Sequence, residues 1–126
     1  MTLDRQVFSG LDTILIRVRH IEAAQAWYER MLGMVPTYVD PVRRIVVMDT
    51  GKPTSLTLWE LKPGEQSATP GMMGTPPIFH ADSAPAMRDA LMGRGVVVEK
   101  LECNGWLQTF GFYDPDGNRL EICEMI

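Results

Sequence analysis

The order of the predicted elements repeats once along the chain, and this repetition constrains the fold most. In the first half, apolar side chains alternate over residues 11–20, which predicts a strand. Residues 21–34 then repeat apolar side chains at helical spacing until Gly33, which predicts a helix with a glycine stop. Three strand candidates follow, separated by the turn stretches "DPVR" and "DTGKPT"; they span residues 35–40, 43–49 and 54–61.

The second half has the same order. A strand is predicted over residues 76–82 and a short helix over 83–95, with an Asp or Ser cap and Pro85 in its first turn. Strand candidates follow over 96–102, 105–114 and 118–125. Thr13 and Pro76, in the first strands of the two halves, are 63 residues apart, and Thr57 and Glu121, in their last strands, are 64 apart. This near-equal offset indicates an internal duplication.

The duplication predicts an α+β fold of two tandem βαβββ modules. We place module one at residues 9–62, a linker rich in Pro, Gly and small polar residues at 63–74, and module two at 75–126. With 126 residues, 45% of them hydrophobic, the chain fits one domain, residues 1–126. Each helix should cover one face of its sheet, and the other faces should form a U-shaped cleft.

Charge and hydropathy exclude several classes of partner. The net charge is −4, and no Lys/Arg cluster is longer than Arg43–Arg44, so we expect no nucleic-acid partner. No apolar run approaches the roughly 20 residues of a membrane span. The first ten residues lack the apolar stretch of a signal peptide, so a cytoplasmic location is the default expectation.

Three stretches of the chain resemble the vicinal-oxygen-chelate superfamily, which includes glyoxalases, bleomycin-resistance proteins and extradiol dioxygenases. The most specific is the closing turn and strand "FYDPDGNRLEICE"; the others are "LDTILIRVRHIEAAQAWYERMLGM" and "PPIFHADSAPAMRDALMGRGVVV". The resemblance covers nearly the whole chain and implies a homodimer, in which one cleft can combine strands from two chains. In metal-using members, the first and fourth strands of each half supply one ligand each: His or Gln, Glu, His and Glu.

The resemblance places these four ligand positions on Thr13, Thr57, Pro76 and Glu121. Proline cannot ligate through its side chain, and a hydroxyl is a poor ligand for such ions. Glu121 is therefore the only matching ligand position, and we expect no metal site and no cofactor. The alternative of a divalent metal stays open, including a displaced site that would use His80 with Glu121.

Strand parity predicts which side chains line the cleft, because successive side chains point to opposite faces. The candidate ligand-binding residues are Thr13, Arg17, Thr57, Trp59, Ile78 and Arg119. Apolar walls with a few polar groups are typical of sites for small organic molecules, and the arginines suit an anionic group. Glu121 and His80 are the candidate catalytic residues. Structural roles stay open beside these: an ion pair of Glu121 with either arginine, a hydrogen-bonded His80, and packing for Trp59.

The leading interpretation is a metal-free, small-molecule-binding member of the glyoxalase, bleomycin-resistance and dioxygenase type. One alternative is an enzyme: a divalent-metal-dependent lyase, isomerase or dioxygenase, or a metal-independent acid-base enzyme that uses Glu121 and His80. A third interpretation is a structural or assembly role in which the cleft is vestigial. Whether the chain catalyses a reaction is left open by the sequence.

Overall fold

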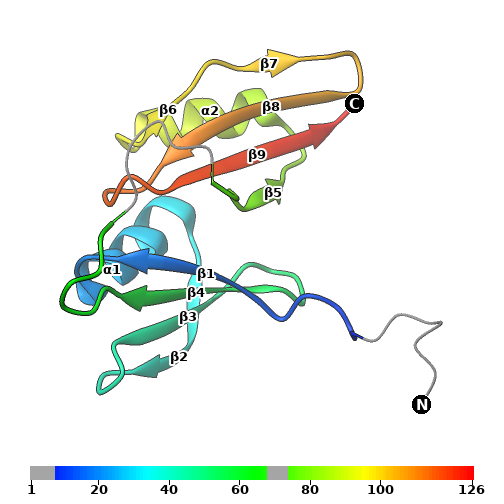
Figure 1. The fold of residues 1–126 in the computed structure, drawn as a ribbon. Helices are drawn as coiled ribbons and strands as arrows, with labels where there is room; N and C mark the ends of the chain where they lie inside the picture. Colours follow the sequence, from blue (N-terminus) through cyan, green and yellow to red (C-terminus); the bar gives the residue numbers. More distant parts are fainter. Residues whose placement is uncertain (1–7, 68–73) are drawn as a thin grey trace.

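The computed structural model describes residues 8–67 and 74–126 and shows two sheets, each with one helix (Figure 1). In the first sheet the strand order is β1-β4-β3-β2, and β1 runs parallel to β4. Its elements are β1 (Thr13–Val18), α1 (Ile21–Leu32), β2 (Val35–Asp40), β3 (Ile45–Asp49) and β4 (Ser55–Glu60).

The second sheet repeats this topology. Its strand order is β5-β9-β8-β6, β7 also pairs with β8, and β5 runs parallel to β9. Its elements are β5 (Ile78–His80), α2 (Ala84–Gly93), β6 (Val97–Val98), β7 (Glu102–Cys103), β8 (Leu107–Tyr113) and β9 (Arg119–Met125). The predicted α+β fold with its doubled order is therefore confirmed. No helix of the described residues is long and apolar enough to cross a membrane.

The strand predicted over residues 96–102 is divided into β6 and β7 by a bulge. Glu99 donates its N–H to the carbonyl of Gly111 on β8, at 2.7 Å, and Glu102 pairs with Thr109. Three residues on one strand thus oppose two on the other, which inserts one extra residue and bends the strand. Strand β5 is also shorter than predicted, because Pro76 and Pro77 have no N–H to give to a sheet.

Both helices end or begin where the sequence predicts. Helix α1 stops at Gly33, which has φ of 68° and donates its N–H to the carbonyl of Glu29 at 3.0 Å. Helix α2 begins after Ser83, whose Oγ accepts the N–H of Ala86 at 3.2 Å, and Pro85 lies in its first turn.

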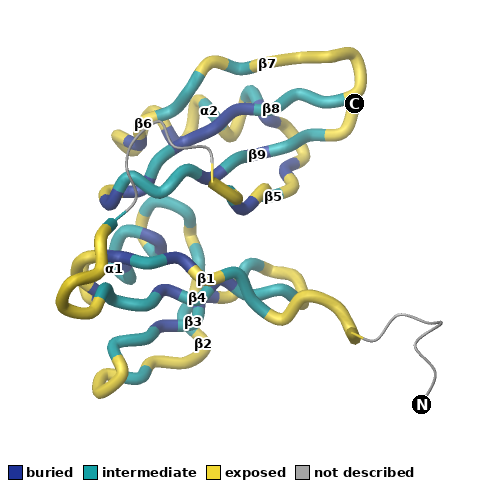
Figure 2. Tube along the Cα trace, viewed as in Figure 1, coloured by how far each residue is buried: buried dark blue, intermediate teal, exposed yellow. Residues whose placement is uncertain are grey.

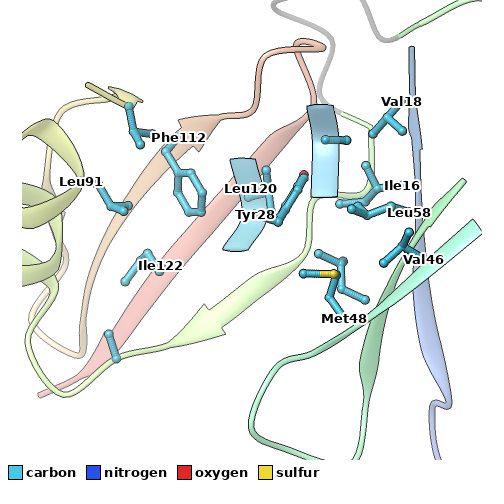
Figure 3. Close-up of a cluster of buried hydrophobic side chains, with 14 of the residues drawn as sticks. Ile16, Val18, Tyr28, Val46, Met48, Leu58, Leu91, Phe112, Leu120 and Ile122 are labelled. Atoms are coloured by element: carbon cyan, nitrogen blue, oxygen red, sulfur yellow. The ribbon is translucent and has the colours of Figure 1, made fainter. Parts of the chain in front are cut away.

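One hydrophobic core joins the helix-covered faces of both sheets. In Figure 2, buried positions alternate with partly exposed ones along β1 and β4, as expected for sheets covered on one face. Figure 3 shows Tyr28 of α1 between Leu120 of the second sheet and Ile16 of the first. The largest fully buried side chains come from both modules: Tyr28, Phe112, Met48, Leu56, Leu58, Leu91, Leu120, Val18 and Val46.

The turn at residues 114–118 connects the two modules through a buried carboxylate. Asp114 is 5% exposed and accepts the hydroxyl of Tyr28 at 2.7 Å. It also accepts the N–H groups of Asp116 and Asn118, both at 2.9 Å. Burial raises the pKa of Asp114, while its hydrogen-bond donors act in the opposite direction. Burial and the neighbouring carboxylate together raise the pKa of Tyr28 well above its ordinary value.

The same turn also holds the end of β1. The Asn118 side chain donates to the carbonyl of Arg17 at 2.9 Å, and Asp116 accepts the N–H of Arg19 at 2.9 Å. These bonds, together with Tyr28, fix the start of β9 beside the end of β1. The turn stretch "DPDGN" is therefore an intermodule contact as well as a reversal of the chain.

We predict that Tyr28→Phe destabilises the protein by about 1–3 kcal/mol, because it removes a buried hydrogen bond to a carboxylate and keeps the ring. Tyr38→Phe is the matched control, since Tyr38 is 54% exposed and its hydroxyl contacts Asp40 at the surface. Its effect should stay within about 0.5 kcal/mol. Denaturant unfolding followed by circular dichroism measures both; equal unfolding midpoints for the two variants would contradict the bridging role of Tyr28.

Candidate functional site

The faces of the two sheets that the helices do not cover form the candidate site, and we call them the concave faces. Parallel pairing sets Leu15 of β1 beside Thr57 of β4, and Ile78 of β5 beside Glu121 of β9. Leu15 is 49% exposed and Ile78 is 60% exposed. In β1 and β9 the even-numbered residues point instead into the core, as strand parity predicts; the buried ones are Ile16, Val18, Leu120 and Ile122.

On the first sheet, two positions that the resemblance assigns to metal ligands carry threonines that bond to each other. The Oγ1 atoms of Thr13 and Thr57 are 2.7 Å apart. Each hydroxyl thus already has a partner of its own kind. Neutral hydroxyls are also weaker ligands for divalent transition metals than imidazole or carboxylate.

On the second sheet, Glu121 forms an ion pair with Arg119, two residues before it on β9. Arg119 also donates to Glu99, with Nη2 of the guanidinium 2.7 Å from Oε1 of the carboxylate. Glu99 in turn accepts the hydroxyl of Tyr113 at 2.5 Å. We call these four side chains the Arg119 network. Hydrogen bonds from Arg119, and then from Tyr113, lower the pKa of Glu99, so its carboxylate form is favoured.

Gly111 provides the space in which the Arg119 network lies. Gly111 pairs with Glu121 between β8 and β9. A Cβ atom at this position would overlap the carboxylate of Glu99 and the guanidinium of Arg119. Because Gly111 has no side chain, the guanidinium of Arg119 can lie over it, between the carboxylates of Glu99 and Glu121. The sequence patterns do not single out Glu99, Gly111 or Tyr113, although the alternation in the predicted strand 105–114 places Gly111 and Tyr113 on one face.

Arg17 is the second guanidinium of the concave faces, and it is held by its own chain. It donates to the carbonyl oxygens of Trp59 and Glu60, at 3.2 and 3.0 Å, and forms an ion pair with Glu65. Its guanidinium lies 4.6 Å from the centre of the Trp59 ring, and the ammonium of Lys62 lies at the same distance. The beginning of the predicted linker therefore packs against the end of the first sheet.

The two arginines line one cavity of about 310 Å³ where the modules meet. Leu15, Pro76 and Asn118 also contribute to its walls. Side chains from β1 and from the start of β9 thus come together although about 100 residues separate them in the chain. The volume lies at the lower end of the range typical of small-molecule sites.

His80 is separate from the Arg119 network. It is exposed and pairs with Cys123, while Ile78 pairs with Glu121, so His80 lies two residues further along the sheet. Two residues of strand correspond to roughly 7 Å. Within residues 8–67 and 74–126, no hydrogen bond or ion pair joins His80 to Glu121.

The donors at the four family positions do not fit the divalent ion that the resemblance implies. Two are threonines bonded to each other, Pro76 lacks a donor, and Glu121 is paired with Arg119. Across the part of the chain that the structure describes, no group of three or more His, Cys, Asp or Glu side chains could hold a metal ion. The first sheet instead provides hydroxyls, Leu15 and the stacked Arg17–Trp59 pair, and the second provides the Arg119 network.

Solved structures with the same fold come from several bacteria. TnmS3, an antibiotic binding protein from Streptomyces sp. CB03234, is 23% identical, with a TM-score of 0.78 over 97% of this chain and 100% of its own. A member of the glyoxalase/bleomycin resistance protein/dioxygenase superfamily from Sphaerobacter thermophilus DSM 20745 is 24% identical. Its TM-score is 0.78 over 94% of this chain and 99% of its own. The fosfomycin resistance protein FosX from Listeria monocytogenes is 14% identical, with a TM-score of 0.76 over 95% and 96%.

Sequence comparison agrees with the fold. No curated protein matches the chain in a sequence search. A family model described as Glyoxalase/Bleomycin resistance protein/Dioxygenase superfamily matches residues 10–122, which is most of the chain. The doubled topology and this match lead to the same conclusion: the chain belongs to the glyoxalase/bleomycin resistance protein/dioxygenase superfamily.

Proposed function

We propose that the protein binds a small organic molecule on its concave faces without a divalent metal at the four family positions. The observation that carries this proposal is the occupation of those positions. The Thr13 and Thr57 hydroxyls bond to each other, and the Glu121 carboxylate is paired with Arg119. A metal at Glu121 would have to displace this guanidinium, and it would gain only one carboxylate ligand among the four positions.

The chemistry of the two walls supports a ligand with an apolar body and polar groups. On the first sheet, Leu15 and Trp59 offer an apolar and an aromatic surface beside the Thr57 hydroxyl. On the second, the Arg119 network offers a guanidinium that is already oriented by two carboxylates. Apolar surface provides affinity in such sites, and a few fixed polar groups provide orientation.

The ligand that we propose carries an anionic group. Arg17 and Arg119 both line the cavity at the module junction. Glu99 and Glu121 already neutralise Arg119, so Arg17 is the guanidinium that would bind a carboxylate or phosphate group through two parallel hydrogen bonds. Glu65 now occupies Arg17, so an anionic ligand would exchange with this carboxylate. The structural neighbour TnmS3 is an antibiotic binding protein, which agrees with ligand binding as a use of this fold.

We further propose that two copies of the chain complete the site as a homodimer. Leu15 and Ile78 are both about half exposed or more on the concave faces of one chain. The edge strand β2 adds Tyr38, which is 54% exposed and pairs with Val47, the neighbour of Thr57 on the same face. Exposed apolar side chains gathered on one surface are typical of interfaces, and most soluble homo-oligomers are closed dimers.

The metal-free proposal predicts the metal content of the protein. Purified without a chelator, the protein should contain far less than one equivalent of Mn, Fe, Ni or Zn by mass spectrometry. Glu121→Gln should leave that content unchanged. One equivalent of metal that Glu121→Gln removes would instead support the metal-dependent lyase, isomerase or dioxygenase alternative.

The binding proposal predicts which tryptophan contributes to ligand binding. In a thermal-shift panel of drug-like molecules and metabolites, a compound that raises Tm should lose its effect in Trp59→Ala, because Trp59 faces the site with Arg17. Trp106→Ala is the matched control, since Trp106 is 77% exposed in the turn between β7 and β8 and lies on neither β1 nor β4. A panel with no positive compound, or equal losses in both variants, would count against binding and favour the assembly role.

The dimer proposal predicts the mass at which the native chain sediments and how a charge at Ile78 lowers it. Sedimentation should give a dimer for the native chain and a shift toward monomer for Ile78→Asp, because a charge would be buried without a partner in the interface. Val42→Asp is the control: Val42 is 90% exposed at the β2–β3 turn, so the dimer should persist. A native chain that sediments as a monomer would disprove the dimer while leaving ligand binding to be decided by the panel.

A further inference from the structure

A second cavity, of about 530 Å³, lies between the modules on the side of the sheets that the helices cover. Its floor consists of Leu91, Phe112 and Ile122, which are buried core residues of the second module. Its opposite wall comes from the end of α1, with Met31 and Leu32. This cavity is larger than the one between Arg17 and Arg119, and it shares no lining residue with it.

The cavity is a groove open to solvent, because exposed residues of both modules line it, among them Val35, Met87 and Ala90. Closer approach of the two modules would cover this apolar surface, so the open groove leaves hydrophobic stabilisation unused. Contacts at two points set the spacing of the modules instead. Tyr28 bonds to Asp114, and Nη1 of Arg94 donates to the carbonyl of Met31 at 2.6 Å.

The cavity walls are unusually adaptable. Met31, Met34 and Met87 line the cavity from α1, from the segment after it and from α2, so three of the nine methionines of the chain meet here. Methionine has an unbranched, polarisable side chain that adjusts to ligands of different shape. Methionine-lined apolar surfaces are therefore suited to binding rather than to fixed packing.

The ionisable side chains of this cavity lie at its rim. Asp49, His80 and Arg94 line the cavity and are exposed to solvent. The floor offers no charged partner, so a charged group placed there would lose its hydration without compensation. The cavity thus suits a molecule whose buried part is uncharged.

We infer that this cavity, which we call the intermodule cavity, binds an uncharged, largely apolar small molecule at a site distinct from the concave faces. The volume lies within the range of small-molecule pockets, and both modules and both helices contribute to it. A bound molecule would fill the gap beside the buried floor and would hold the modules at their present spacing. Binding would therefore stabilise the folded chain by mass action.

The neutral dye N-phenylnaphthylamine is the probe that tests this inference. Titrated into the native protein, it should gain fluorescence saturably and shift the NMR signals of the isotope-labelled methyl groups of Met31, Met34 and Met87. Met92 is the internal reference, since it lies on α2, is 50% exposed and does not line the cavity. Absence of saturable binding, or methyl shifts that leave these three methionines unchanged, would overturn the inference.

Filling the intermodule cavity should remove the site. Ala90 is exposed on α2 and lines the cavity, so Ala90→Phe should weaken dye binding by about tenfold or more, equivalent to about 1.4 kcal/mol. Ala86→Phe is the matched control, since Ala86 is exposed on the same helix outside the cavity, and it should bind as the native chain does. Equal affinities for both variants would overturn the inference.

Two further comparisons keep the test independent of folding and of the concave faces. If Ala90→Phe does not fold, Met87→Ala against Met92→Ala replaces it, with weaker binding expected only for Met87→Ala. Trp59→Ala should bind the dye as the native chain does, because Trp59 lies outside the intermodule cavity. Dye binding that depends on Trp59 and not on residues of the cavity would place the dye on the concave faces and overturn the inference.

Discussion

The buried carboxylate of Asp114 is the constraint on which the arrangement of the two modules depends. It accepts the Tyr28 hydroxyl from the first module while it closes the turn before β9 in the second. A carboxylate that is 5% exposed requires donors on every side, and the turn backbone and Asn118 supply them. Because the donors come from both modules, the site at their junction depends on this group, and the cavity behind it depends on this group together with the Arg94–Met31 bond.

The concave faces carry their own set of side chains at the positions that the family resemblance assigns to metal ligands. Three of these four positions lie on the parallel strand pairs β1–β4 and β5–β9, where they hold a threonine pair and an ion-paired glutamate. On the second sheet, a guanidinium held by two carboxylates lies over a glycine. A fixed guanidinium orients the polar groups of a bound molecule through hydrogen bonds, whereas a metal ion coordinates such groups directly.

Local patterns predicted most of the fold and only part of the site. The helix stop at Gly33 and the Ser83 cap depend on backbone conformations that few residue types satisfy, so the sequence indicates them directly. Parity also placed Arg119 and Glu121 on one face. Parity did not reveal that Glu99 joins them, because a bulge interrupts the strand that carries it.

The sequence by itself determined the duplicated α+β topology and the faces of the strands, and it places residue types that are poor metal ligands at Thr13, Thr57 and Pro76. These follow from periodicity and side-chain chemistry, which are properties of short segments. Only the tertiary structure decided that Glu121 pairs with Arg119 and that Arg17 pairs with Glu65. Strand parity leaves both arginines as candidates for Glu121, and the choice depends on where the folded chain places each guanidinium. Arg119 lies beside Glu121 on β9, whereas Arg17 is held by Glu65, 48 residues away in the chain.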